Sequence, residues 1–103
     1  MSSVAYTIGA EKSYDRALTE DSPVSKLGVR PDDDPPYGGG WVWRTAEDAR
    51  AFIASQKVPL WFTPAVYELR LPTGWDVDVS KDVEEDGVHR LLNDAIIVRK
   101  MQG

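Results

Sequence analysis

The sequence contains no cysteine and a single histidine, His89. The lack of cysteine excludes disulfides, thiolate nucleophiles and thiolate metal ligands together. A zinc site would need carboxylates for nearly all of its ligands, and that composition is uncommon in structural and catalytic zinc sites. We therefore expect no metal site, and the stability of the fold has to come from side-chain packing.

Negative charge outnumbers positive charge in this chain. Twelve Lys and Arg residues stand against 17 Asp and Glu residues, which gives a formal net charge of −5. Proteins that bind nucleic acid or anionic membranes gain affinity from clustered Lys and Arg, whereas only Arg99 and Lys100 are adjacent here. We expect neither nucleic acid nor a membrane surface as a partner.

Long apolar runs are missing as well. No run approaches the length of a membrane span, and residues 1–16 lack the basic segment and apolar run of a secretory leader. We expect a soluble, cytoplasmic protein of bacterial origin. With 103 residues, 42% of them hydrophobic, the chain fits one domain, 1–103, with one hydrophobic core.

The most irregular stretch covers residues 19–40, which hold four prolines, four glycines and five acidic residues. Proline removes a backbone donor and disfavours helix for the residue before it, so this stretch predicts a long, partly stiff loop. A loop of this length in a small domain is usually functional or mobile. Just before it, residues 13–20 open with a Ser that can cap a short helix.

Strands are predicted where β-branched and aromatic residues concentrate, namely over residues 4–9, 41–44, 65–71 and 95–101. A further strand is predicted over residues 75–80, because apolar and polar residues alternate there. Its apolar side is predicted to carry Trp75, Val77 and Val79, and its polar side Asp76, Asp78 and Ser80. The acidic residues 81–87 predict a surface turn, helical in one interpretation, that leads to the segment VHRLL.

One main helix is predicted over residues 46–56. Thr45 can accept a hydrogen bond from the backbone amide of Asp48, as in a capping box. One helical stripe then carries the apolar residues Ala46, Ala49, Phe52 and Ile53. The order of elements predicts an α+β domain with a mostly antiparallel sheet and this helix packed on it.

Two short patterns resemble known ligand loops but lack essential residues. Gly38–Gly40 lead into a strand rather than a helix, and the next helix begins with acidic residues, which disfavours a phosphate site. The segment DVDVSKDVEEDG resembles a calcium loop, but Lys81 replaces the required Gly and Gly87 replaces the bidentate Glu. His89 has no acidic partner at a diagnostic spacing. We therefore predict no catalytic residue and no cofactor.

The aromatic residues are the stronger candidates for a site. Trp41 and Trp43 share one side of a strand, with Val42 on the other. Large aromatic side chains form the core of a small sheet or line a ligand groove or partner interface, and both interpretations stay open here. The candidate binding residues are Tyr6, Tyr37, Trp41, Trp43 and Arg44.

The stretch VSKLGVRPDDDPPYGGGWVWRTAEDARAFI, followed by AVYELRLP, resembles small proteins of the ADP-ribosyltransferase-like fold over residues 24–71. The resemblance implies a split antiparallel sheet, a groove for a nicotinamide nucleotide beside the first strands, and transfer of ADP-ribose from NAD. The family's first strand carries Arg or His, where this chain has Tyr6 and Thr7, and Glu68 lies in a different strand from the family's catalytic Glu. The resemblance therefore assigns no catalytic residue.

Three hypotheses about function follow from the sequence. The first is a non-enzymatic domain that binds a protein or a small-molecule ligand. The second is a degenerate or minimal NAD-binding transferase, with NAD as its cofactor. The third is an acidic inhibitor or decoy that presents residues 32–34 or 82–86 to a basic partner. The sequence does not indicate an oligomeric state.

Overall fold

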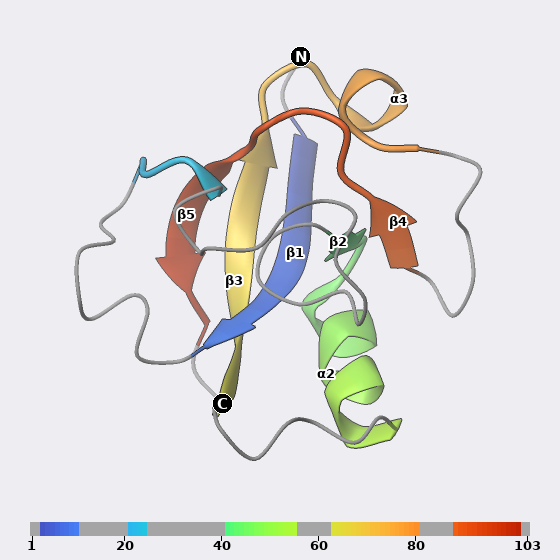
Figure 1. Cartoon of the computed structure of the whole chain (residues 1–103), viewed down its shortest axis with the longest axis vertical. Coiled ribbons are helices and arrows are strands. Elements are labelled where there is room, and N and C mark those ends of the chain that lie inside the picture. The colour runs from blue at the N-terminus through green and yellow to red at the C-terminus, as the bar shows by residue number, and fades with distance from the viewer. Residues whose placement is uncertain (1–2, 11–20, 25–40, 56–62, 81–87, 102–103) are drawn as a thin grey trace.

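A computed structural model of the chain describes residues 3–10, 21–24, 41–55, 63–80 and 88–101. Within these ranges the chain forms five strands and two helices. The strands lie side by side in one sheet, and the longer helix crosses one of its faces (Figure 1). This arrangement confirms the expected α+β class with a mostly antiparallel sheet and one main helix.

The sheet has the strand order β4-β2-β1-β3-β5, and every neighbouring pair is antiparallel. The strands are β1 (Ser3–Ala10), β2 (Trp41–Trp43), β3 (Pro64–Leu71), β4 (Val88–Arg90) and β5 (Ile96–Lys100). The long pair of β1 and β3 forms the centre of the sheet, with Tyr6 opposite Glu68 in the register. The predictions of β1, β2, β3 and β5 are confirmed to within one or two residues at each end.

The main helix, α2 (Ala46–Ser55), begins where the sequence predicts it. The backbone N–H of Asp48 donates to Thr45 Oγ1 at 3.1 Å, so Thr45 caps the first turn. The predicted apolar stripe faces the sheet, and α2 contacts β1, β2 and β3. The apolar stripe of α2 therefore meets the apolar side chains that alternate onto the same face of the strands.

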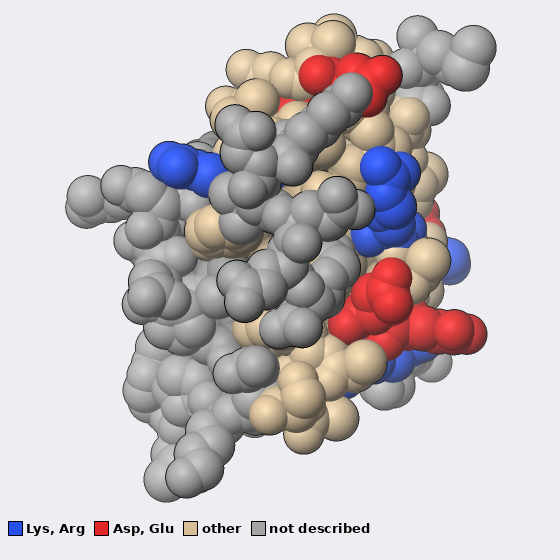
Figure 2. Space-filling view, turned by 90° about the vertical axis from the view of Figure 1, so that its right-hand side faces the viewer, with Lys and Arg blue, Asp and Glu red and all other residues tan. Residues whose placement is uncertain are grey.

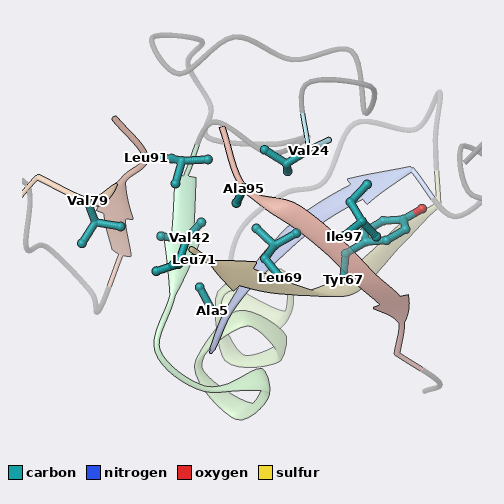
Figure 3. Packing of buried hydrophobic residues seen from close by; sticks show 10 residues of the cluster. All are labelled: Ala5, Val24, Val42, Tyr67, Leu69, Leu71, Val79, Leu91, Ala95 and Ile97. Atoms are coloured by element: carbon teal, nitrogen blue, oxygen red, sulfur yellow. The ribbon is translucent and has the colours of Figure 1, made fainter. Parts of the chain in front are cut away.

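The apolar side chains of the sheet form two clusters, one on each face. The helix-side cluster lies under α2 and has as its buried members Ile8, Trp43, Ala49, Val66 and Val88. The far-side cluster lies on the opposite face and contains Ala5, Val24, Val42, Tyr67, Leu69, Leu71, Val79, Leu91, Ala95 and Ile97 (Figure 3). Figure 3 shows Val79 and Leu91 at one end of the far-side cluster and Tyr67 and Ile97 at the other. Both faces of the sheet therefore carry buried apolar side chains.

The strand predicted over residues 75–80 is wrong. Residues Trp75–Asp78 form one helical turn, α3, preceded by Gly74 with φ 91°, a backbone conformation that favours glycine. The predicted exposure is reversed at two positions, because Val77 is 55% exposed whereas Asp78 is only 2% exposed. Asp76 is exposed and Val79 is buried, as predicted. Only Val79 pairs with another strand segment, through a single bridge to Leu91.

Strand β4 was not predicted from the sequence. It pairs with β2 at one edge of the sheet, with Val42 opposite His89 and Trp43 opposite Val88. The segment VHR is too short for alternation to identify it as a strand, and tertiary pairing with β2 creates it.

Part of the predicted irregular loop extends the sheet at its other edge. Pro23 forms an antiparallel bridge with Ile96, and the N–H of Asp21 donates to the carbonyl of Ile97 at 2.8 Å. The remainder of the loop lies outside the described residues, as do the predicted helix at 13–20 and the acidic turn at 81–87.

Candidate functional site

The sheet separates the predicted binding residues onto its two faces. Tyr6, Trp41 and Trp43 all pack on the helix-side cluster, and Tyr6 lies directly opposite Trp43 in the pairing of β1 with β2. Val42, between the two tryptophans, belongs to the far-side cluster, as the alternation predicts. Tyr37 lies outside the described residues.

Trp43 belongs to the core. Its side chain is fully buried at 0% exposure, and its ring lies 5.0 Å from that of Phe52 in α2, with an angle of 49° between the ring planes. The indole Nε1 of Trp43 is buried without a hydrogen-bond partner among the described residues. Trp43 therefore fixes α2 against the sheet and offers no surface for a partner to contact.

Trp41 and Tyr6 differ from Trp43 because both are only half-buried. The hydroxyl of Thr7, which is itself buried, donates to the backbone carbonyl of Trp41 at 2.7 Å. This bond ties the first residue of β2 to β1 and so holds the Trp41 backbone in place. Trp41 and Tyr6 are the predicted residues on this face that remain partly exposed.

Arg44 lies beyond the end of β2 and is exposed. Its guanidinium carbon lies over the ring of Trp75, 4.5 Å from the ring centroid. Trp75 packs against the far-side cluster, so Arg44 contacts the face of the sheet opposite α2. A stacked Arg of this kind gains about 0.5–1 kcal/mol at an exposed site and keeps its N–H groups free to donate in the guanidinium plane.

Trp75 also contacts His89, with ring centroids 5.4 Å apart in an edge arrangement at 69°. Its indole N–H donates to the carbonyl of Val4 at 3.2 Å, which anchors the ring to β1. His89 is only 5% exposed, and its Nδ1 has no hydrogen-bond partner among the described residues. We name the set of Arg44, Trp75 and His89 the Arg–Trp–His cluster.

The sequence grouped Arg44 with Tyr6, Trp41 and Trp43, whereas the structure places Arg44 against Trp75, which packs on the other face of the sheet. The link between Arg44 and Trp75 depends on α3, where the sequence predicts a strand instead. The burial of His89 depends on the pairing of β4 with β2, since His89 lies opposite Val42 and thus on the far-side face. A local pattern in the sequence could not have supplied either relationship.

The described residues contain no group of three or more His, Asp or Glu side chains that could hold a metal ion. They also contain no helix with both the length and the apolar character needed to cross a membrane. Figure 2 views the molecule from the side of β4 and α3, and there Lys and Arg side chains lie beside separate groups of Asp and Glu. The described surface on this side therefore carries both signs of charge.

No protein-family model, curated protein or solved structure matches this chain. The resemblance to the ADP-ribosyltransferase-like fold therefore stays a prediction.

Proposed function

We propose that this chain is a small non-enzymatic domain, cytoplasmic and bacterial, that binds a protein partner or a small ligand through an aromatic surface. The surface consists of Tyr6 and Trp41, with Tyr37 added from the sequence. The observation that supports it is the half-buried state of Tyr6 and Trp41, next to a fully buried Trp43. Large aromatic side chains on a rigid support contribute strongly to binding because they lose little entropy when they are covered.

The support under this surface is rigid for physical reasons. Trp43 and Phe52 lock α2 onto the sheet, and the Thr7 hydroxyl holds the Trp41 backbone. Pre-organised contacts reduce the entropic cost of association. Trp43 therefore contributes to binding indirectly, by supporting the contact surface.

The test compares the immobilised wild-type chain with Trp41→Ala and Tyr6→Ala in quantitative capture from a bacterial lysate. Any captured protein is then purified and its Kd measured against each variant. We expect both variants to weaken the Kd at least about tenfold, the equivalent of 1.4 kcal/mol. Val77→Ala serves as a surface control, because Val77 is exposed on α3, whose Trp75 packs against the far-side cluster and not the helix-side one.

Folding of every variant is checked by circular dichroism and urea unfolding. An unchanged Kd for folded Trp41→Ala and Tyr6→Ala would contradict the proposed surface. Unfolding of Trp41→Ala would make that ring a structural residue and would also remove it from the surface. As a fold reference, Trp43→Ala should lose about 3–5 kcal/mol of stability, the usual cost of removing a buried tryptophan.

A second candidate is an NAD-binding domain, which the resemblance implies. It is favoured by one observation, namely that Tyr6 and Trp43, on the first two strands, are direct partners in the sheet, and the resemblance implies a nucleotide groove beside the first strands. NAD at millimolar concentration should then shift the backbone amide signals of Tyr6, Trp43 and Thr45 in a titration followed by NMR. An unchanged spectrum would rule out this candidate and leave the first proposal standing.

The acidic decoy hypothesis concerns residues 32–34 and 82–86, which lie outside the described residues, and it stays a prediction.

A further inference from the structure

The Arg–Trp–His cluster lies on the far-side face and is separate from the aromatic surface proposed above. It brings together an exposed cation and a buried imidazole on one indole ring. The three residues come from separate segments, namely the end of β2, α3 and β4. The cluster forms only because the fold brings these three segments together. Local sequence preference does not account for it.

Arg44 differs from other exposed arginines of the described chain in what it contacts. Arg70 lies 3.8 Å from Asp21 and Arg99 lies 3.3 Å from Glu68, so each has a carboxylate partner. Arg44 has no ion pair within the described residues, and its contact there is the face of Trp75 at 4.5 Å. Stacking occupies the flat face of the guanidinium and leaves the N–H groups at its edge for another acceptor.

Neighbouring groups hold both the backbone and the guanidinium of Arg44 in place. Its backbone lies between the buried Trp43 and the helix cap Thr45. Its guanidinium rests on Trp75, which is anchored by the hydrogen bond to the Val4 carbonyl. A guanidinium held in this way loses less side-chain entropy when it binds a planar or tetrahedral oxyanion.

His89 supplies the second, independent observation. Its Nδ1 is buried and has no hydrogen-bond partner in the described part of the chain. Leaving such a group unsatisfied destabilises the fold, and buried polar atoms without partners are therefore rare. His89 therefore places an unsatisfied polar group beside Trp75, the ring on which Arg44 lies.

We propose that the Arg–Trp–His cluster binds an oxyanion, a phosphate or carboxylate group of a small ligand. Arg44 binds two oxygens of the anion through the edge of its guanidinium, and Trp75, which contacts both Arg44 and the buried His89, orients the guanidinium. Acidic side chains elsewhere on the β4 and α3 side repel an anion and so lower its affinity (Figure 2). We therefore expect a weak affinity for the isolated ion, with a Kd of about 1–10 mM.

The experiment titrates the full chain separately with sodium phosphate and sodium acetate, and follows it by NMR at constant ionic strength set with NaCl. Three side-chain signals report on the cluster: Arg44 Nε–H, the Trp75 indole N–H and the His89 ring C–H. We expect these signals to shift in a saturable manner with at least one of the two anions. Saturation by phosphate alone identifies a phosphate site, saturation by acetate alone a carboxylate site, and saturation by both a general oxyanion site.

Variants distinguish the site from a general ionic effect. Arg44→Gln should weaken the Kd at least about tenfold, and Arg44→Lys by an intermediate factor, because Lys keeps the charge but not the planar edge. Arg99→Gln removes the same charge at a distant ion pair and should leave the Kd unchanged. Shifts that do not saturate, or that persist equally in Arg44→Gln, would overturn the proposal. Neither result depends on whether Tyr6 and Trp41 bind a partner.

Discussion

The Asp78 carboxylate receives two hydrogen bonds from Thr73, one from the backbone N–H at 3.0 Å and one from the hydroxyl at 2.8 Å. Asn93 Nδ2 adds a third contact at 3.4 Å from the segment after β4. Asp78 therefore closes the turn that joins β3 to α3 and connects this turn to the segment after β4. Since α3 carries Trp75, the Thr73–Asp78 pair also positions the ring on which Arg44 lies.

Asp78→Ala should lower the free energy of unfolding by about 2–3 kcal/mol, because hydrogen bonds to a charged acceptor contribute more than neutral ones and their donors lose their partner. The measurement is urea unfolding followed by tryptophan fluorescence. Val77→Ala is the matched control, since Val77 is the adjacent residue and is exposed. That change should stay within about 0.5 kcal/mol. Equal losses for both variants would show that the carboxylate contributes nothing particular to the turn.

These two neighbours also show where the sequence stops predicting the fold. Alternation places Val77 inside and Asp78 outside, which holds only if the segment is a strand. Gly74 and the Thr73–Asp78 bonds favour a helical turn instead, and the exposure of the two side chains is reversed. Side-chain hydrogen bonds to the local backbone compete with strand formation, and periodicity does not contain this information.

The central part of the fold was predictable for the opposite reason. In α2, the cap at Thr45 and the apolar stripe both indicate a helix, and residues 65–71 have clear strand composition. Local preference and tertiary packing agree there.

Predictability differs in the same way among the site residues. The common face of Trp41 and Trp43 follows from strand alternation. The stacking of Arg44 on Trp75 does not, because it joins residues 31 positions apart through a turn that was predicted as a strand. The buried position of His89 likewise depends on β4, whose three residues carry too little periodicity to predict.

Thr45→Ala should cost about 1 kcal/mol of stability, because the Asp48 N–H at the exposed start of α2 loses its side-chain acceptor. Thr45→Ser should restore most of this loss, since serine keeps the hydroxyl. Thermal or urea unfolding of the three proteins measures the difference. At the other end of α2, the Ser55 hydroxyl donates to the Phe52 carbonyl at 3.1 Å in an exposed position, and Ser55→Ala should have a smaller effect. A Thr45→Ala protein as stable as the wild type would show that the cap contributes nothing measurable.

His89→Phe should leave the free energy of unfolding unchanged or raise it by about 1 kcal/mol. Phenylalanine keeps an aromatic ring against Trp75 and Val42, and it removes a buried nitrogen that has no partner among the described residues. The neighbouring Leu91→Ala provides the contrast, because it empties part of the far-side cluster and should cost about 2–5 kcal/mol. If His89→Phe is instead strongly destabilising, then the imidazole has a structural role that its geometry does not reveal. A His89→Phe protein that is more stable but binds phosphate or acetate more weakly would show that His89 favours ligand binding at the expense of stability. This relationship is expected of a functional residue held in a core.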